Sequence, residues 1–171
     1  MPTPTPPLVT IDTVHDHVHK GITVQASYKS PEGADVADNS DVTLAIFTGR
    51  RTSHLAFQVA AGGDAELLLY EGASLSANGT NLSAYNLNRA DSIFTPSTHV
   101  THTPSVTTNG ILLHNSFLPG GIAGGSVGGT ARSETEWELK ADTIYMIKLI
   151  NRGGNAQPMS IVAQWYEEEP G

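Results

Sequence analysis

Three histidines at alternate positions, His15, His17 and His19, are the side chains of this sequence whose types and spacing best suit chemistry. On a β-strand, residues two apart project from the same face, so the three imidazoles would lie together. Imidazoles gathered in this way can bind a transition metal, and Asp12 and Asp16 lie nearby in the sequence. The pattern therefore makes the three histidines candidate metal ligands. The alternative is a polar segment whose histidines contact backbone or solvent, because no fourth ligand is evident.

A jelly-roll enzyme of the cupin kind is the metal-dependent function to weigh, because cupins bind a metal through a His-x-His pair. His15-Asp16-His17 matches that fragment. A cupin would have a glutamate shortly afterwards, whereas residues 20–22 are Lys, Gly and Ile. The run Pro119-Gly120-Gly121 leads into further glycines and supplies no later histidine. A cupin-like enzyme is therefore the less favoured alternative.

The other ionisable and glycine-rich segments do not form a catalytic pattern either. Glu136 and Glu138 alternate with apolar residues and are expected on the solvent face of a strand, and residues 167–169 form an acidic tail. The glycine-rich run at 120–129 lacks the Lys and Ser/Thr of a phosphate-binding loop. No strand–turn–helix elbow of the Gly-x-Ser-x-Gly kind is evident. We therefore expect a protein that is not an enzyme and needs no cofactor.

The elements that must position these side chains are β-strands, because apolar and polar residues alternate along much of the chain. Strands are expected at 22–28, 42–48, 54–61, 65–71, 98–103 and 110–118. Gly62-Gly63-Asp64 predicts a tight turn that joins two of them as a β-hairpin. We expect one all-β domain over residues 11–171, an antiparallel β-sandwich of jelly-roll type. An immunoglobulin-like sandwich is the alternative.

The last third of the chain, residues 134–167, predicts a meander of three successive strands at the centre of the core, and both tryptophans lie in it. The second strand, Thr143 to Ile150, is apolar on both faces except for Lys148. One face is expected in the core, and the other under the N-terminal arm or a neighbouring subunit. The loop after this strand is a further expected contact. The predicted contact residues of this region are Ile144, Met146, Ile150 and Arg152.

Residues 1–10 predict an extended N-terminal arm, because four prolines fix φ and remove backbone donors. One interpretation is a terminus without fixed structure, and the other is an ordered strap on a neighbouring protein. In the second, Pro4, Pro6, Pro7 and Leu8 are the contact residues. The loops at 30–41, 72–96 and 119–133 are the other expected contact elements.

The composition limits the partners. Only 15% of the residues are charged, which suits a β-protein whose outer faces meet other subunits, and the formal net charge is -8. That charge disfavours nucleic acid and anionic membranes as partners. No apolar run approaches the roughly 20 residues of a membrane helix. Cysteine is absent, which excludes disulfides and thiolate metal sites.

Several short strings, taken in order, resemble one family of proteins. They are His15-Asp16-His17-Val18-His19-Lys20-Gly21, Leu69-Tyr70-Glu71-Gly72-Ala73, Asn86-Leu87-Asn88-Arg89, His102-Thr103-Pro104, Leu139-Lys140 to Tyr145, and Ile150-Asn151-Arg152 to Glu167. Together they resemble the head decoration proteins (cement or auxiliary capsid proteins) of tailed double-stranded-DNA bacteriophages. The resemblance covers the chain from Val14 to Glu167 and consists of structural strings, not a catalytic motif. The proline-rich arm and the long glycine loop depart from it.

The resemblance implies a structural function. Decoration proteins are commonly β-rich and often trimeric, and they clamp the mature shell against internal DNA pressure. For this chain it implies a homotrimer bound to the major capsid protein on the virion exterior. His15, His17 and His19 would then form a ring around a three-fold axis, with a metal or an anion between subunits. The alternatives are a head fibre base, or a tail receptor-binding or carbohydrate-binding module with Tyr85 as a sugar contact.

Overall fold

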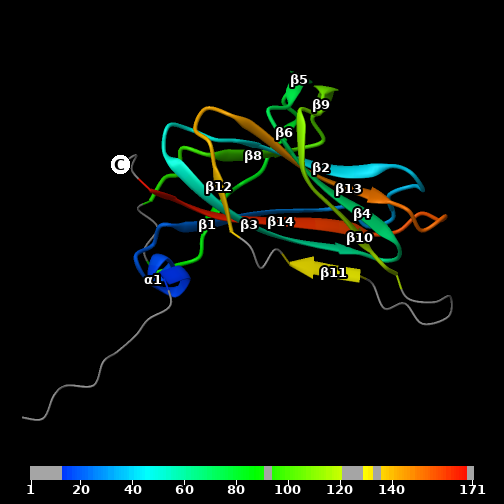
Figure 1. Cartoon of the computed structure of the whole chain (residues 1–171). Coiled ribbons are helices and arrows are strands. Elements are labelled where there is room, and N and C mark those ends of the chain that lie inside the picture. Colours follow the sequence, from blue (N-terminus) through cyan, green and yellow to red (C-terminus); the bar gives the residue numbers. More distant parts are fainter. Residues whose placement is uncertain (1–12, 91–93, 121–128, 133–135, 169–171) are drawn as a thin grey trace, which may run out of the picture.

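The protein is seen in a computed structural model, which describes residues 13–90, 94–120, 129–132 and 136–168. It is built from two antiparallel β-sheets packed face to face, with one short helix at one end (Figure 1). The predicted all-β antiparallel sandwich is therefore confirmed. The arm at residues 1–10 lies outside the described residues, as does most of the glycine loop.

The first sheet has the strand order β11-β3-β14-β1-β7, and β12 also pairs with β3. Its strands are β1 (Thr23–Lys29), β3 (Thr52–Ala61), β7 (Tyr85–Asn86), β11 (Gly129–Arg132), β12 (Trp137–Leu139) and β14 (Met159–Glu168). The longest of these, β3 and β14, pair over ten residues in the middle of the sheet.

The second sheet has the order β10-β4-β13-β2-β8-β6. Its strands are β2 (Asp41–Phe47), β4 (Ala65–Glu71), β6 (Thr80–Asn81), β8 (His99–His102), β10 (Ile111–Leu118) and β13 (Ile144–Asn151). A separate two-stranded ribbon is made by β5 (Ser74–Ala77) and β9 (Ser105–Thr108), and the helix α1 spans Thr13–His19.

The eight main strands of the sandwich alternate between the two sheets along the chain. The path β1, β2, β3, β4 crosses the sandwich at each step, and so does the path β10, β11, β13, β14. The eight strands stand in the orders β1-β14-β3-β11 and β2-β13-β4-β10. This is the strand order expected for a jelly roll, in which a folded ribbon of paired strands wraps around the core.

Two predicted connections are wrong for the same reason. Gly62-Gly63-Asp64 was expected to close a hairpin, but β3 and β4 lie in different sheets and the turn is a corner between them. The final strands β12, β13 and β14 likewise do not form a flat meander, because β13 belongs to the opposite sheet. Alternation in a sequence indicates which face of a strand is buried. It does not indicate which strand lies beside it.

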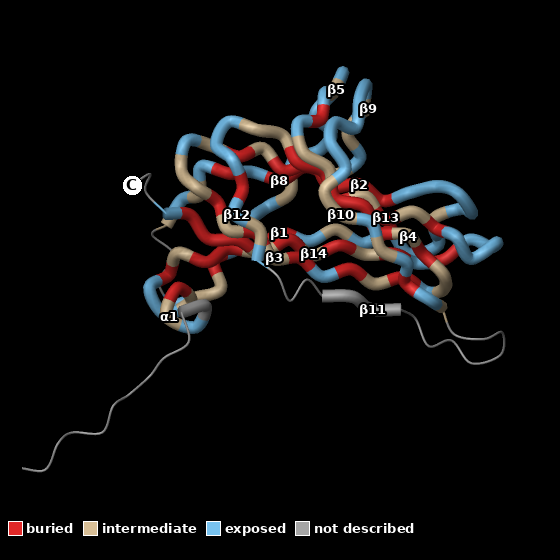
Figure 2. Tube along the Cα trace, viewed as in Figure 1, coloured by how far each residue is buried: buried red, intermediate tan, exposed pale blue. Residues whose placement is uncertain are grey.

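The core lies between the sheets and follows the period of two along each strand (Figure 2). From the first sheet it takes Val24, Ala26, Leu55, Phe57, Val59, Ala61, Leu139, Met159, Ile161, Ala163 and Trp165. From the second it takes Val42, Leu44, Ile46, Ala65, Leu67, Leu69, Val100, Leu118, Tyr145, Ile147 and Leu149. Burial of one large apolar side chain contributes about 1.5–3 kcal/mol. This double row is therefore the main stabilising term of the fold.

The chain between β4 and β10, residues 72–110, is one long insertion that extends both sheets. Its strand β7 adds to the first sheet beside β1, and β8 and β6 add to the second sheet beyond β2. The expected loop at 72–96 therefore contains short strands. These additions cover the free backbone edges of β1 and β2, which would otherwise be open to pairing with another chain.

The outer face of β13 is covered by this same insertion. Gly72 and Ala73 donate backbone hydrogen bonds to the Ile144 carbonyl, which directs the chain across the second sheet. A small apolar cluster forms there from Ala45, Phe47, Tyr70, Ala73, Leu75, Val106, Ile144 and Met146. Met146 is fully buried in it. At Ile144 and Met146 this face is thus covered by residues 73, 75 and 106 of the same chain, and the expected cover from the arm or a neighbouring subunit stays a prediction.

Candidate functional site

The segment that holds His15, His17 and His19 is the helix α1, so the expectation of a strand is wrong. The last turn is closed by a hydrogen bond from the Lys20 amide to the Asp16 carbonyl, 2.8 Å long, and the chain then turns at Gly21 with φ of 68°. The Lys20 ammonium lies 2.6 Å from the Asp16 carboxylate. Its hydrogen bond lowers the pKa of Asp16.

A helix separates the three histidines instead of gathering them. His15 and His19 are four residues apart on one exposed face, and their Nε2 atoms are 2.9 Å apart. His17 faces the other way and is buried. The three imidazoles do not converge within one chain, and the described residues contain no group of three side chains able to hold a metal ion. A ring of histidines around a symmetry axis stays a prediction.

His17 instead belongs to a cluster on the outer face of the first sheet, made of His17, His54, Glu136, Tyr166 and Glu168. The Tyr166 ring stacks on His54 at 4.5 Å between centroids and meets His17 at 4.1 Å. Its hydroxyl donates a 2.7 Å hydrogen bond to Glu136, whose same oxygen lies 2.8 Å from His54 Nδ1. We call this group the His17–Tyr166 cluster.

The His17–Tyr166 cluster fastens α1 to the sheet. The Glu168 carboxylate has one oxygen 3.9 Å from His17 Nε2 and the other 3.8 Å from His54 Nε2. Burial raises the pKa of Tyr166, and the hydrogen bond to Glu136 raises it further, so the phenol stays protonated. The sequence did not indicate this cluster, because its members come from four separate segments and Glu136 was expected to face solvent.

Other polar side chains are also used to fix loops. Glu167 is buried, although it was expected in a solvated tail, and it accepts hydrogen bonds from the Ser97 amide at 2.9 Å and the Thr98 amide at 2.7 Å. At the opposite end of the sandwich, Asn151 donates to the Val36 carbonyl at 2.7 Å and accepts from Gln157. The first pair of bonds ties residues 97–98 to β14, and the second pair ties the loop at Val36 to the loop that follows β13.

The remaining predicted contact residues have varied positions. Arg152 donates two hydrogen bonds to Glu66, of 2.6 and 3.0 Å, and one to Asn39 of 2.7 Å, so its guanidinium is engaged within the chain. Ile144 and Ile150 are half-buried. Pro4, Pro6, Pro7 and Leu8 lie outside the described residues. None of these positions presents a bare apolar surface that the structure describes.

The uncovered apolar surface lies on β10. Four large hydrophobic side chains are exposed in the described residues, and three are on this strand: Ile111 at 64%, Leu112 at 48% and Phe117 at 59%. The fourth, Tyr85, is on β7. A regular strand over the predicted range 110–118 would place Ile111, Leu113 and Phe117 on one face. A bulge between Leu112 and His114 shifts the register, so Leu118 points into the core and Phe117 points out.

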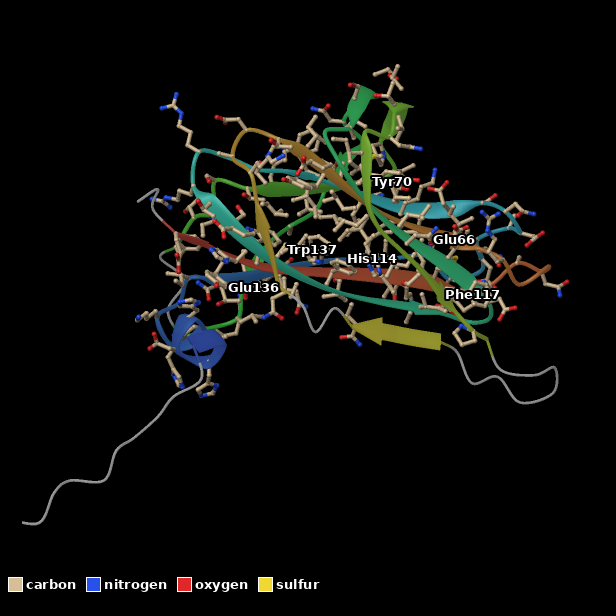
Figure 3. All side chains as sticks on the ribbon, viewed as in Figure 1. Glu66, Tyr70, His114, Phe117, Glu136 and Trp137 are labelled. Atoms are coloured by element: carbon tan, nitrogen blue, oxygen red, sulfur yellow. The ribbon has the colours of Figure 1, made fainter. Side chains whose placement is uncertain are left out.

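We call the exposed strand with its three apolar side chains the β10 edge. Figure 3 shows Phe117 near the end of the strand, and His114 beside Trp137 where the two sheets meet at this side of the molecule. The two rings lie edge to face, 6.5 Å apart, and Trp137 packs against the core. They close the sandwich behind the β10 edge, so this surface rests on a packed support.

The β10 edge is electrically neutral. The strand contains no charged residue, and the glutamates opposite its two ends on β4 have cations of their own. Glu71, opposite Ile111, lies 2.6 Å from the Lys140 ammonium. Glu66, opposite Phe117, is bound by Arg152. A strand edge without charged residues and with three exposed apolar side chains suits contact with another protein chain.

Comparison with known proteins adds no assignment: neither a protein-family model nor a curated protein matches this chain. In the part of the chain that the structure describes, no helix is long and apolar enough to cross a membrane.

Proposed function

We propose that this chain is a structural protein of a virion, which binds the outer surface of the head of a tailed double-stranded-DNA bacteriophage and stabilises the mature shell. The observation that carries the proposal is the β10 edge, an exposed apolar strand at the edge of the sandwich, because it is typical of a chain that assembles with other protein chains. Such a surface works by binding, and it needs no reacting group. The short strings from Val14 to Glu167 that resemble head decoration proteins support the same assignment.

The use of the polar side chains also supports a structural role. Glu167, Tyr166 and Asn151 are engaged in hydrogen bonds within the chain that hold loops and the helix in place. In a catalytic site, by contrast, ionisable groups converge on a space that a substrate can enter. The three side chains named here fasten loops and the helix instead, which supports a structural role.

The partner in this proposal is the major capsid protein, met on the virion exterior. One contact of ordinary size buries about 1,600 Å² in total, and repetition of the contact over a symmetric shell adds avidity. The net charge of -8 favours a basic capsid surface by steering association. No turnover is involved, so the measurable quantity is occupancy.

Binding to heads tests the proposal directly. Expanded heads of the encoding phage, produced without this chain, are mixed with the purified protein and sedimented. We expect saturable binding and a rise in the temperature at which the heads release their DNA. A reconstruction of the decorated head then locates the chain. Absence of the chain from purified virions by mass spectrometry, together with no binding to expanded heads, would reject the proposal.

A further inference from the structure

We propose that the β10 edge pairs with the β10 edge of a second copy of this chain, in antiparallel orientation about a two-fold axis. The inference rests on the proposed function in one respect: it names an assembly contact for a protein proposed to work by assembly. It concerns the isolated protein, however, and is tested without any phage component.

The backbone of β10 is the first observation. The strand is eight residues long and ends its sheet, with β4 as its one partner among the described strands. The strands at the other sheet edges are much shorter: β6 and β7 have two residues each, β12 has three and β11 has four. Proteins blunt free edges by shortening them or by placing charges or proline there. Only β10, among the described edges, is long, uncharged and free of proline.

The side chains of β10 are the second observation. Ile111, Leu112 and Phe117 are about half to two-thirds exposed, and no described element covers them. An antiparallel pair about the middle of the strand would bring the Phe117 end of one copy beside the Leu112 end of the other. An aromatic side chain beside an aliphatic one is a favourable cross-strand contact. Each copy would thus cover the apolar side chains of the other, and both sets would be buried in one contact.

The charges near the β10 edge are balanced, so this edge can meet an identical edge. The protein as a whole is acidic, at -8, so two copies repel one another over most of their surface. At the β10 edge this repulsion is weakest, because Glu71 and Glu66 are matched by Lys140 and Arg152. A neutral strand is complementary to itself. A two-fold axis requires such self-complementarity, because the same patch serves both subunits.

The size of the contact sets its strength. Two paired strands bury less than the roughly 1,200 Å² below which interfaces are weak or transient. We therefore expect a dimer that dissociates on dilution, not an obligate one. The resemblance to decoration proteins implies a trimer instead, so the number of subunits distinguishes the two.

Sedimentation equilibrium of the full chain over a wide concentration range tests the inference. We expect a reversible monomer–dimer equilibrium that is strengthened by added NaCl, because salt screens the repulsion between acidic copies. Phe117→Lys places a charge on the edge and should weaken dimerisation about tenfold or more. The matched control is Tyr85→Lys on β7, because Tyr85 is 60% exposed and Phe117 is 59% exposed. This control should leave the monomer–dimer equilibrium unchanged.

Disulfide trapping gives a second, independent readout, because the chain has no cysteine of its own. Asn115→Cys introduces one exposed thiol near the middle of β10, and mild oxidation should convert most of the dimer to a covalent pair. Ser27→Cys, exposed on β1, should stay monomeric under the same conditions. Circular dichroism confirms that each variant is folded.

The outcomes are distinct. A protein that stays monomeric at high concentration overturns the inference, as does a trimer or a dimer that Phe117→Lys leaves intact. If Phe117→Lys abolishes binding to heads while the free protein is always monomeric, the β10 edge contacts the capsid, and the inference fails although the proposed function stands. If the dimer forms but the protein does not bind heads, the inference stands and the proposed function fails.

Discussion

The Tyr145 hydroxyl donates a 2.9 Å hydrogen bond to the Glu71 carboxylate, across the neighbouring strands β13 and β4. The same hydroxyl accepts a hydrogen bond from the Lys140 amide at 2.9 Å, and the Lys140 ammonium lies 2.6 Å from the other oxygen of Glu71. The three residues close one end of the sandwich and anchor the turn before β13.

Tyr145→Phe should destabilise the fold by about 1–2 kcal/mol, because it leaves the Lys140 amide and one Glu71 oxygen without their partner. The measurement is the free energy of unfolding from urea titration followed by tryptophan fluorescence. Tyr85→Phe, at an exposed tyrosine, is the control and should change nothing measurable. Equal stability of the two variants would contradict the role given to Tyr145.

Stability should fall at high pH through Tyr145. Burial raises the pKa of Tyr145 from 10.0 to about 12. A folded-state pKa above the unfolded value gives a stabilising contribution that is complete below pH 10 and is lost as the pH rises through about 12. Tyr145→Phe should therefore flatten the alkaline limb of the stability curve. A limb unchanged in that variant assigns the loss to other groups.

Stability should fall at low pH through Glu71. The hydrogen bond from Lys140, and then that from Tyr145, lowers the pKa of Glu71 below its ordinary value of 4.5. A lowered pKa gives a contribution that is present above the ordinary value and is lost as the pH falls through the folded-state pKa. Glu71→Gln should thus be less stable than the parent at pH 7, and the difference should shrink in acid. The control is Glu32→Gln, in an exposed loop.

Removal of the Glu167 carboxylate should release the segment at residues 97–98. Two backbone amides donate to it, and an amide buried without a partner costs about 1–3 kcal/mol. Glu167→Ala should lower stability by that order and speed hydrogen exchange at Ser97 and Thr98. If these two amides exchange at the same rate as in the parent protein, Glu167 does not hold residues 97–98 in place.

His17→Ala should detach α1 from the first sheet, because the imidazole packs on Tyr166 and faces Glu168. A helix of seven residues is not stable alone in water, so its amides should exchange about tenfold faster or more. His15→Ala, on the exposed face of the same helix, is the matched control. Similar exchange rates in both variants would contradict the role of His17 in fastening α1 to the first sheet.

Much of the secondary structure could be predicted from the sequence, because period-two alternation reports directly which face of a strand is buried. The expected strand at 54–61 became β3, and that at 65–71 became β4. Their assignment to opposite sheets could not be predicted, because β3 buries the same face whether β4 lies beside it in one sheet or opposite it in the other. The sandwich was therefore foreseen, whereas the hairpin and the meander were not.

The sites were harder to predict for two physical reasons. The spacing of the histidines at alternate positions suits a strand. The ion pair between Asp16 and Lys20, four residues apart, supports a helix instead. The spacing alone does not decide between the two structures. The apolar β10 edge was hidden by its bulge, which reverses the facing of Phe117 relative to a regular strand. The helix and the bulge both depend on the conformation of a few residues, which the alternation of apolar and polar residues over a longer segment does not determine.

The position of β14 bears on how the protein is made. It follows all other described strands in the chain, yet it lies between β1 and β3 in the middle of the first sheet. During synthesis β1 and β3 therefore leave the ribosome long before their shared partner exists. The first sheet can close only after residues 159–168 have emerged, so folding is completed late, and a chain cut short before β14 should be cleared as unfolded.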